Sequence, residues 1–95
     1  MTALSSEGLD TRRRKLLFRA WRRGVREMDL IVGRFADVAL PLLDTSGLDD
    51  FERLIEVPNS ELYAWITATA AVPDDYDTQV LRRLQAFYRQ TAEGK

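Results

Sequence analysis

Apolar residues recur along most of this chain at the spacing of amphipathic α-helices. The first group falls at i, i+1, i+4 and i+5, and it consists of Leu16, Leu17, Ala20 and Trp21. This spacing predicts a helix with Asp10 or Thr11 as its N-cap. We expect Gly24 to end the helix, because glycine tolerates the positive φ of a left-handed cap.

A second helix is predicted after Gly24, from apolar residues at i, i+3, i+4 and i+7. These residues are Met28, Ile31, Val32, Phe35, Ala36 and Ala39. Pro41 has no backbone N–H, and its ring clashes with the carbonyl four residues back. The helix should therefore end or kink close to Ala39 or Leu40.

The middle of the chain predicts two shorter helices, which Pro58 separates. The first runs from about Thr45 to Glu56 with Asp44 or Ser46 as its cap, and Asn59 is expected to cap the second. Their inward positions are Leu48, Phe51, Leu54 and Ile55, followed by Leu62, Trp65, Ile66 and Thr69.

The last helix is expected to follow Pro73. Acidic residues should form its start, because they complement the positive end of a helix dipole. They are Asp74, Asp75 and Asp77, and the apolar stripe behind them is Val80, Leu81, Leu84, Phe87 and Tyr88. No stretch alternates with the period of two of a β-strand, so the sequence predicts an all-α fold, a small five-helix bundle.

The size of the chain, 95 residues with 45% apolar and 31% charged, supports one hydrophobic core. We expect a single five-helix domain over residues 11–91, between a frayed N-terminal segment of residues 1–10 and a C-terminal tail of residues 92–95. No apolar run approaches the about 20 residues that cross a bilayer, and the first ten residues lack the basic and apolar regions of a signal peptide. The expected location is therefore the cytoplasm, without membrane insertion.

Motifs for catalysis and for cofactor or metal binding are missing from the sequence. There is no Cys, which excludes disulfides and thiol catalysis, and no His, the side chain most used for acid–base chemistry near neutral pH. Phosphate-binding glycine loops, zinc-protease motifs and calcium loops are also absent. We therefore predict a protein that is not an enzyme, with no catalytic, metal-binding or cofactor-binding residue.

The net charge of −1 conceals an uneven distribution of charge along the sequence. Residues 11–26 hold no acid and the following bases: Arg12, Arg13, Arg14, Lys15, Arg19, Arg22, Arg23 and Arg26. Residues 27–78 are predominantly acidic. Clustered cations repel one another unless an acidic group lies nearby, within the molecule or on a partner, so this asymmetry informs about partners rather than about the fold.

The junction of the first two predicted helices, at Gly24, is a candidate binding site. Glycine has no Cβ, so the backbone of a partner could approach closely between Arg23 and Glu27. In the simpler interpretation Gly24 is only a corner, Glu27 complements the start of the second helix and the arginines are solvated. Trp21, beside the basic cluster, also has two interpretations, as a core residue or as a contact residue.

The run Arg23-Gly24-Val25-Arg26-Glu27 resembles the RGxxE motif of the SdhE family, small assembly factors that promote covalent attachment of FAD to the flavoprotein subunit of succinate dehydrogenase. The resemblance extends over about residues 13–87. Its further matching positions are Arg22, Asp29, Phe35, the block from Phe51 to Glu56, Leu62, Trp65 and Pro73. One departure is Pro41, where the second helix of the family continues.

This resemblance implies a chaperone that docks on the flavoprotein subunit of succinate dehydrogenase, or of fumarate reductase, while the partner's own histidine bonds to the flavin. FAD is then the cofactor of the partner, and this chain binds none stably. The partner-binding residues that it implies are Arg23, Gly24 and Glu27, then Asp29, and then Arg22 and Arg26. Because a mitochondrial presequence is absent, we expect a bacterial protein, and we expect a monomer.

Two other classes of protein remain open from the residues alone. A nucleic-acid binder could use the basic first helix and Trp21 against phosphates and bases. The acidic remainder of the chain would repel DNA and RNA, so we expect no nucleic acid as a partner. A protein-interaction module of antitoxin type would use the same surface.

Overall fold

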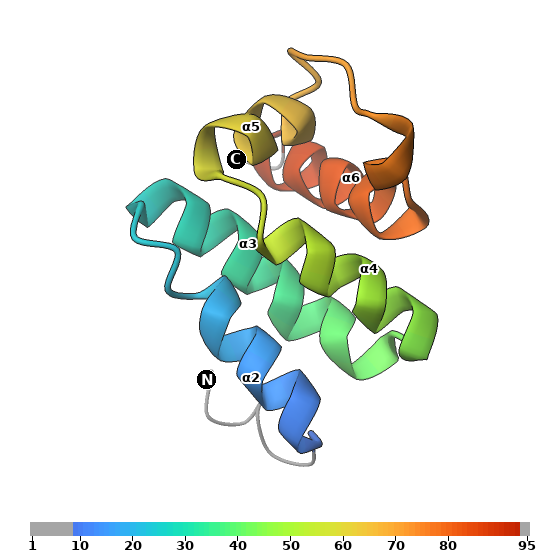
Figure 1. The fold of residues 1–95 in the computed structure, drawn as a ribbon. Coiled ribbons are helices and arrows are strands. Elements are labelled where there is room, and N and C mark those ends of the chain that lie inside the picture. The colour runs from blue at the N-terminus through green and yellow to red at the C-terminus, as the bar shows by residue number, and fades with distance from the viewer. Residues whose placement is uncertain (1–8, 94–95) are drawn as a thin grey trace.

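The structure, a computed structural model, describes residues 9–93. Its α-helices are α2 (Thr11–Ala20), α3 (Arg26–Ala39), α4 (Thr45–Ile55), α5 (Asn59–Ile66) and α6 (Gln79–Glu93). Two 3₁₀ turns accompany them, η1 (Leu40–Leu42) after α3 and η2 (Asp74–Tyr76) before α6. No strand occurs among the described residues, and the predicted all-α bundle of five helices is confirmed (Figure 1).

The helices pack around one apolar core. Helix α2 lies against α3 and α4, while α6 lies against α3, α4 and α5. In Figure 1, α2, α3 and α4 form the lower part of the molecule, and α5 and α6 lie above them. The largest fully buried side chains are Val32, Leu40, Phe51, Leu62, Ile66, Leu81 and Leu84. No helix within residues 9–93 is both long enough and apolar enough to cross a membrane.

Two aspartates begin helices as the sequence predicts. Asp10 Oδ1 accepts a hydrogen bond from the backbone N–H of Arg13 at 2.9 Å, and Asp44 Oδ1 accepts one from the N–H of Gly47 at 2.8 Å. Each bond satisfies one of the N–H groups that have no partner within the first turn of a helix. Helix α3 ends at Ala39, also as predicted, and the chain continues into η1. Residues 1–8 of the predicted frayed segment, and residues 94–95 of the predicted tail, lie outside the described residues.

Helix α2 ends earlier than predicted, at Ala20, with Trp21 as its C-cap. The prediction that Gly24 ends this helix is wrong, although Gly24 has the expected positive φ, +93°. The backbone N–H of Arg23 donates to the carboxylate of Asp29, so the hydrogen bonding of the helix cannot continue as far as Gly24.

The predicted role of Asn59 as a helix cap is also wrong. Pro58 is the N-cap of α5, and no side-chain hydrogen bond caps that helix. The Asn59 side chain turns to Arg23 instead, with 2.6 Å between Asn59 Oδ1 and Arg23 Nε. Thr69, predicted on the inner face of the same helix, lies exposed beyond its C-terminal end.

Helix α6 begins later than predicted, at Gln79, and its expected acidic start lies in η2 and the residue after it. Asp77 leaves the helical conformation, with φ −83° and ψ 72°. The side chain of Thr78 then supports the new helix, because its Oγ1 accepts a hydrogen bond from the N–H of Leu81 at 3.2 Å.

Candidate partner-binding surface

The segment between α2 and α3 turns at Gly24. Its φ of +93° is a backbone conformation that residues with a side chain rarely adopt, so the turn itself requires glycine. Apart from Gly24 and its two chain neighbours, no heavy atom would lie within 4 Å of a Cβ built at Gly24. The backbone at this turn is therefore exposed and open to close approach from outside the molecule.

The side chain of Arg23 folds back onto the molecule. Its Nε donates to Asn59 Oδ1 at 2.6 Å, Nη1 donates to the carbonyl of Ile55 at 2.8 Å, and Nη2 donates to the carbonyl of Val57 at 2.5 Å. Asn59 Nδ2 donates in return to the carbonyl of Arg23 at 3.3 Å. The guanidinium thus satisfies the carbonyl of Ile55, the last residue of α4, where a helix leaves acceptors without partners. Through the carbonyl of Val57 it also ties the Gly24 turn to the α4–α5 connection.

Asp29, in the first turn of α3, holds the same turn from the other side. Its Oδ1 accepts a hydrogen bond from the backbone N–H of Arg23 at 2.5 Å. Burial lowers the pKa of Arg23, an effect that the charge of Asp29 opposes and that of Arg19 increases. Arg23 and Asp29 are therefore both half-buried residues with partners inside the chain.

The other residues predicted to bind the partner point outward. Arg22, Arg26 and Glu27 are exposed, like Gly24. Glu27 lies beside Tyr63 of α5, whose ring meets that of Tyr88 edge to face with 6.4 Å between centroids. The pKa of Tyr63 is raised, mainly by a hydrogen bond with Tyr88 and to a smaller extent by the charges of Tyr88 and Glu27. Of the six predicted positions, two therefore hold the turn and four are exposed.

Most of the basic residues of α2 meet partners within the molecule. Arg12 Nη2 lies 2.6 Å from Asp49 Oδ1 and 2.9 Å from Glu52 Oε1 on α4. Arg13 bonds to Asp10 at 2.7 Å and to the carbonyls of Leu40 and Leu43. The acidic groups that offset the positive charge of the basic cluster therefore lie largely on α4.

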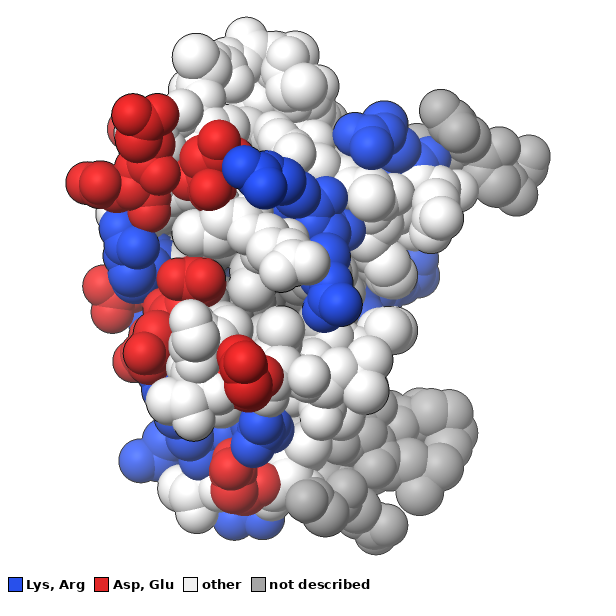
Figure 2. All heavy atoms as spheres, turned by 90° about the vertical axis from the view of Figure 1, so that its right-hand side faces the viewer, with Lys and Arg blue, Asp and Glu red and all other residues white. Residues whose placement is uncertain are grey.

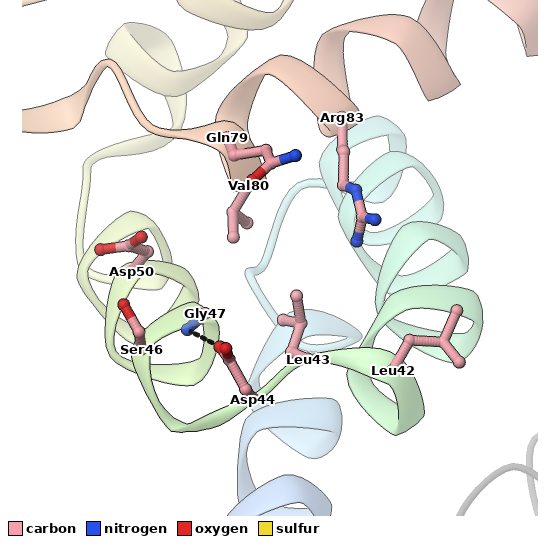
Figure 3. A pocket seen from close by; sticks show the side chains of 9 residues that line it. All are labelled: Leu42, Leu43, Asp44, Ser46, Gly47, Asp50, Gln79, Val80 and Arg83. Carbon is pink, nitrogen blue, oxygen red and sulfur yellow. Dashed lines mark hydrogen bonds between the residues drawn. The ribbon is translucent and has the colours of Figure 1, made fainter.

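Other parts of the surface carry both signs of charge. On the side shown in Figure 2, acidic side chains crowd one edge while basic side chains cross the middle. A hollow between the start of α4 and α6 has the same mixed character, because its lining includes Arg83 from α6 as well as Asp44 and Asp50 from the start of α4 (Figure 3). Within the described residues, no three acidic side chains come together as the ligands of a metal ion would.

Two features of this region escape the sequence analysis. Gly33 allows α3 to approach Trp21 so closely that a Cβ there would lie 2.3 Å from Trp21 Cδ2. The indole Nε1 donates to Asp37 Oδ1 at 3.3 Å, so Trp21 packs within the molecule and is partly buried. A glycine inside an otherwise regular helical pattern is the signal that points to this contact. The second feature is the pairing of Asn59 with Arg23, which no sequence pattern indicates.

The fold and this surface define a small all-α protein with a charged, exposed turn between α2 and α3. The chain belongs to the family described as flavinator of succinate dehydrogenase, whose sequence model matches residues 14–88.

Relatives from both bacteria and eukaryotes support this membership. The chain is 32% identical over 83 residues to the FAD assembly factor SdhE of Acetobacter pasteurianus, covering 87% of this chain and 76% of that protein. It is 37% identical over 73 residues to the mitochondrial succinate dehydrogenase assembly factor 2 of Dictyostelium discoideum, covering 77% of this chain and 52% of the relative. The factor of the same name from Danio rerio is 32% identical over 85 residues, covering 87% of this chain and 54% of that protein. The chain thus spans about half the length of these two eukaryotic relatives.

Proposed function

We propose that this protein is an assembly factor that binds the flavoprotein subunit of succinate dehydrogenase and promotes the covalent attachment of FAD to it. The family description and the names of the relatives support this function. The structural observation that best supports this function for the present chain is the exposed Gly24 turn, which Arg23 and Asp29 hold in place from both sides. The flavoprotein of fumarate reductase is a second partner of the same kind.

The surface suggests a division of labour among the predicted residues. Gly24 lets the backbone of the partner approach, and Glu27, one helical turn on, fixes the register by its charge. Arg22 and Arg26 add positive charge beside them. Arg23 and Asp29, predicted from the resemblance to contact the partner, also have the internal role of holding the turn in shape. Their contact with the partner stays a prediction.

FAD belongs to the partner in this proposal, and this chain binds no cofactor stably. The sequence contains no His, so the residue that becomes bonded to the flavin is supplied by the flavoprotein. The work of the assembly factor is to recognise and hold its partner, as a monomer in a bacterial cytoplasm.

Neither alternative class gains support from the structure. The pairing of Arg12 with Asp49 and Glu52 removes part of the positive field that a nucleic acid would need. A protein-interaction module of antitoxin type would use the same exposed turn, and only its partner would differ.

In-gel fluorescence of covalently bound flavin tests the proposed function. The flavoprotein subunit encoded in the same genome is produced with and without this protein, or with its Gly24→Arg or Glu27→Ala variant. We expect the wild-type chain to increase the flavin signal and both variants to lose that increase.

Matched controls separate the surface from general damage. Leu42→Arg adds the same charge at a side chain that is 73% exposed, and Glu61→Ala removes another exposed glutamate from the first turn of a helix. Both controls should keep full activity. A wild-type chain that neither binds the flavoprotein nor raises its covalent flavin content would refute the proposed function.

A further inference from the structure

A second hollow lies on α2, directly beside the Gly24 turn, and it differs in charge from the one in Figure 3. Its lining consists of Phe18, Arg19, Arg22, Arg23 and Ile55. We call it the α2 hollow. Arginines dominate its lining and no acid takes part, whereas the hollow between α4 and α6 contains Asp44 and Asp50 as well as Arg83.

An exposed aromatic side chain forms one wall of the α2 hollow. Phe18 is 58% exposed, although the other large apolar residues of α2 are buried or partly buried. The guanidinium carbon of Arg22 lies over its ring, 4.5 Å from the centroid. Such a contact contributes about 0.5–1 kcal/mol at an exposed site, too little to explain why a phenylalanine is displayed to solvent. Aromatic and arginine side chains, phenylalanine included, are also enriched in the buried centres of protein interfaces.

The positive charge of the α2 hollow is only weakly neutralised within the described residues. Arg19 approaches Glu56 at 3.9 Å, the limit of an ion pair. The guanidinium donors of Arg23 meet uncharged carbonyl and amide oxygens, although the Asp29 carboxylate lies near enough to accept from the Arg23 backbone N–H. No described acidic side chain forms an ion pair with Arg22. The hollow therefore presents an unbalanced positive charge next to apolar surface from Phe18 and Ile55.

We propose that the α2 hollow binds a segment of the flavoprotein partner in which an Asp or Glu carboxylate stands next to an apolar side chain. The carboxylate meets Arg22 and Arg19, and the apolar side chain covers the Phe18 ring above Ile55. Arg22 and Arg23 line the hollow and lead directly into Gly24, so hollow and turn form one continuous surface. This inference rests on the proposed function, which it extends by naming the chemistry of the partner segment.

The first test measures the affinity of the full-length protein for the purified flavoprotein subunit by isothermal titration calorimetry. Phe18→Ser should raise the dissociation constant about thirtyfold, as expected for the loss of an interface hot spot. Arg22→Glu should weaken binding at least about tenfold, because it sets a negative charge against the carboxylate.

The matched controls lie away from the α2 hollow, at the C-terminal end of α3 and on α6. Val38→Ser alters a side chain with the same exposed fraction as Phe18, 58%, and Arg83→Glu reverses the charge at the hollow of Figure 3. Both should change the dissociation constant by less than about twofold. Circular dichroism checks that all four variants are folded.

A Glu27→Ala variant separates failure of this inference from failure of the proposed function. Lost binding in Glu27→Ala, with binding unchanged in Phe18→Ser and Arg22→Glu, would overturn the role of the α2 hollow and leave the proposed function standing. A wild-type chain without affinity for the flavoprotein would overturn both.

A second test identifies the partner segment itself. A photoreactive phenylalanine analogue at position 18 is cross-linked to the flavoprotein, and mass spectrometry locates the linked peptide. We expect a surface segment with an Asp or Glu next to an apolar residue. Cross-links only to segments without an acidic residue would contradict the proposed chemistry.

Discussion

Replacing Arg23 tests whether this residue holds the Gly24 turn in place. Three donor–acceptor contacts of 2.5–2.8 Å join its guanidinium to Asn59 Oδ1 and to the carbonyls of Ile55 and Val57. Each is a charge-assisted hydrogen bond at a half-buried site, where water can replace part of what is lost, so we assign about 1 kcal/mol to each. Arg23→Ala should therefore lower the free energy of unfolding by about 2–3 kcal/mol.

Arg23→Lys provides the graded comparison for this prediction. Lysine keeps the charge but has a single ammonium in place of the planar fork, so it cannot reach all three acceptors at once. We expect it to recover roughly half of the lost stability. Arg22→Ala, at the exposed neighbouring position, removes only the contact with the Phe18 ring and should cost at most about 1 kcal/mol.

Urea denaturation followed by circular dichroism measures these differences. An Arg23→Ala protein as stable as the wild type, within about 0.5 kcal/mol, would refute the assigned internal role. Equal losses for Arg22→Ala and Arg23→Ala would refute it as well, because the contacts described belong to Arg23 alone.

Two further predictions concern the packing and the start of α2. Gly33→Ala places a Cβ 2.3 Å from Trp21 Cδ2, so we expect a loss of about 1–2 kcal/mol on urea denaturation and a shifted indole N–H resonance in NMR spectra. Gly47→Ala places a Cβ 2.9 Å from the movable Cδ2 of Leu43 and 3.2 Å from Leu43 Cβ, so it is the graded comparison and should cost less than Gly33→Ala; equal stability of both variants would contradict the packing described. The hydrogen bond from the Arg13 backbone lowers the pKa of Asp10 below its ordinary value of 3.8. A pKa depressed in the folded state stabilises the protein above pH 3.8, and this contribution is lost as the pH falls through the folded pKa. The stability of the wild type relative to Asp10→Asn should therefore be greatest above pH 3.8 and decrease as the pH falls through the folded pKa. A difference in stability that does not change with pH would argue against this cap.

Helix positions and caps that depend on nearby residues could be predicted well from the sequence. The spacing of apolar residues placed the helices, and the side chains of Asp10 and Asp44 cap α2 and α4 as expected. The errors occurred where a distant residue decides the local structure. Asparagine is a residue type that often caps helices, yet the side chain of Asn59 pairs with Arg23, which lies far away in the sequence.

The sequence by itself determined the all-α class, the single core and the segment around Gly24 as the candidate surface, because helical periodicity and glycine conformation are local properties. Only the tertiary structure decided which residues of that segment are exposed. Arg23 and Asp29 look like their charged neighbours in the sequence, but the carbonyls at the end of α4 and the N–H of the turn engage them. Likewise, the acids of α4 neutralise part of the basic first helix, whereas no acidic side chain lines the hollow beside Phe18 and Arg19 there approaches Glu56 only at 3.9 Å.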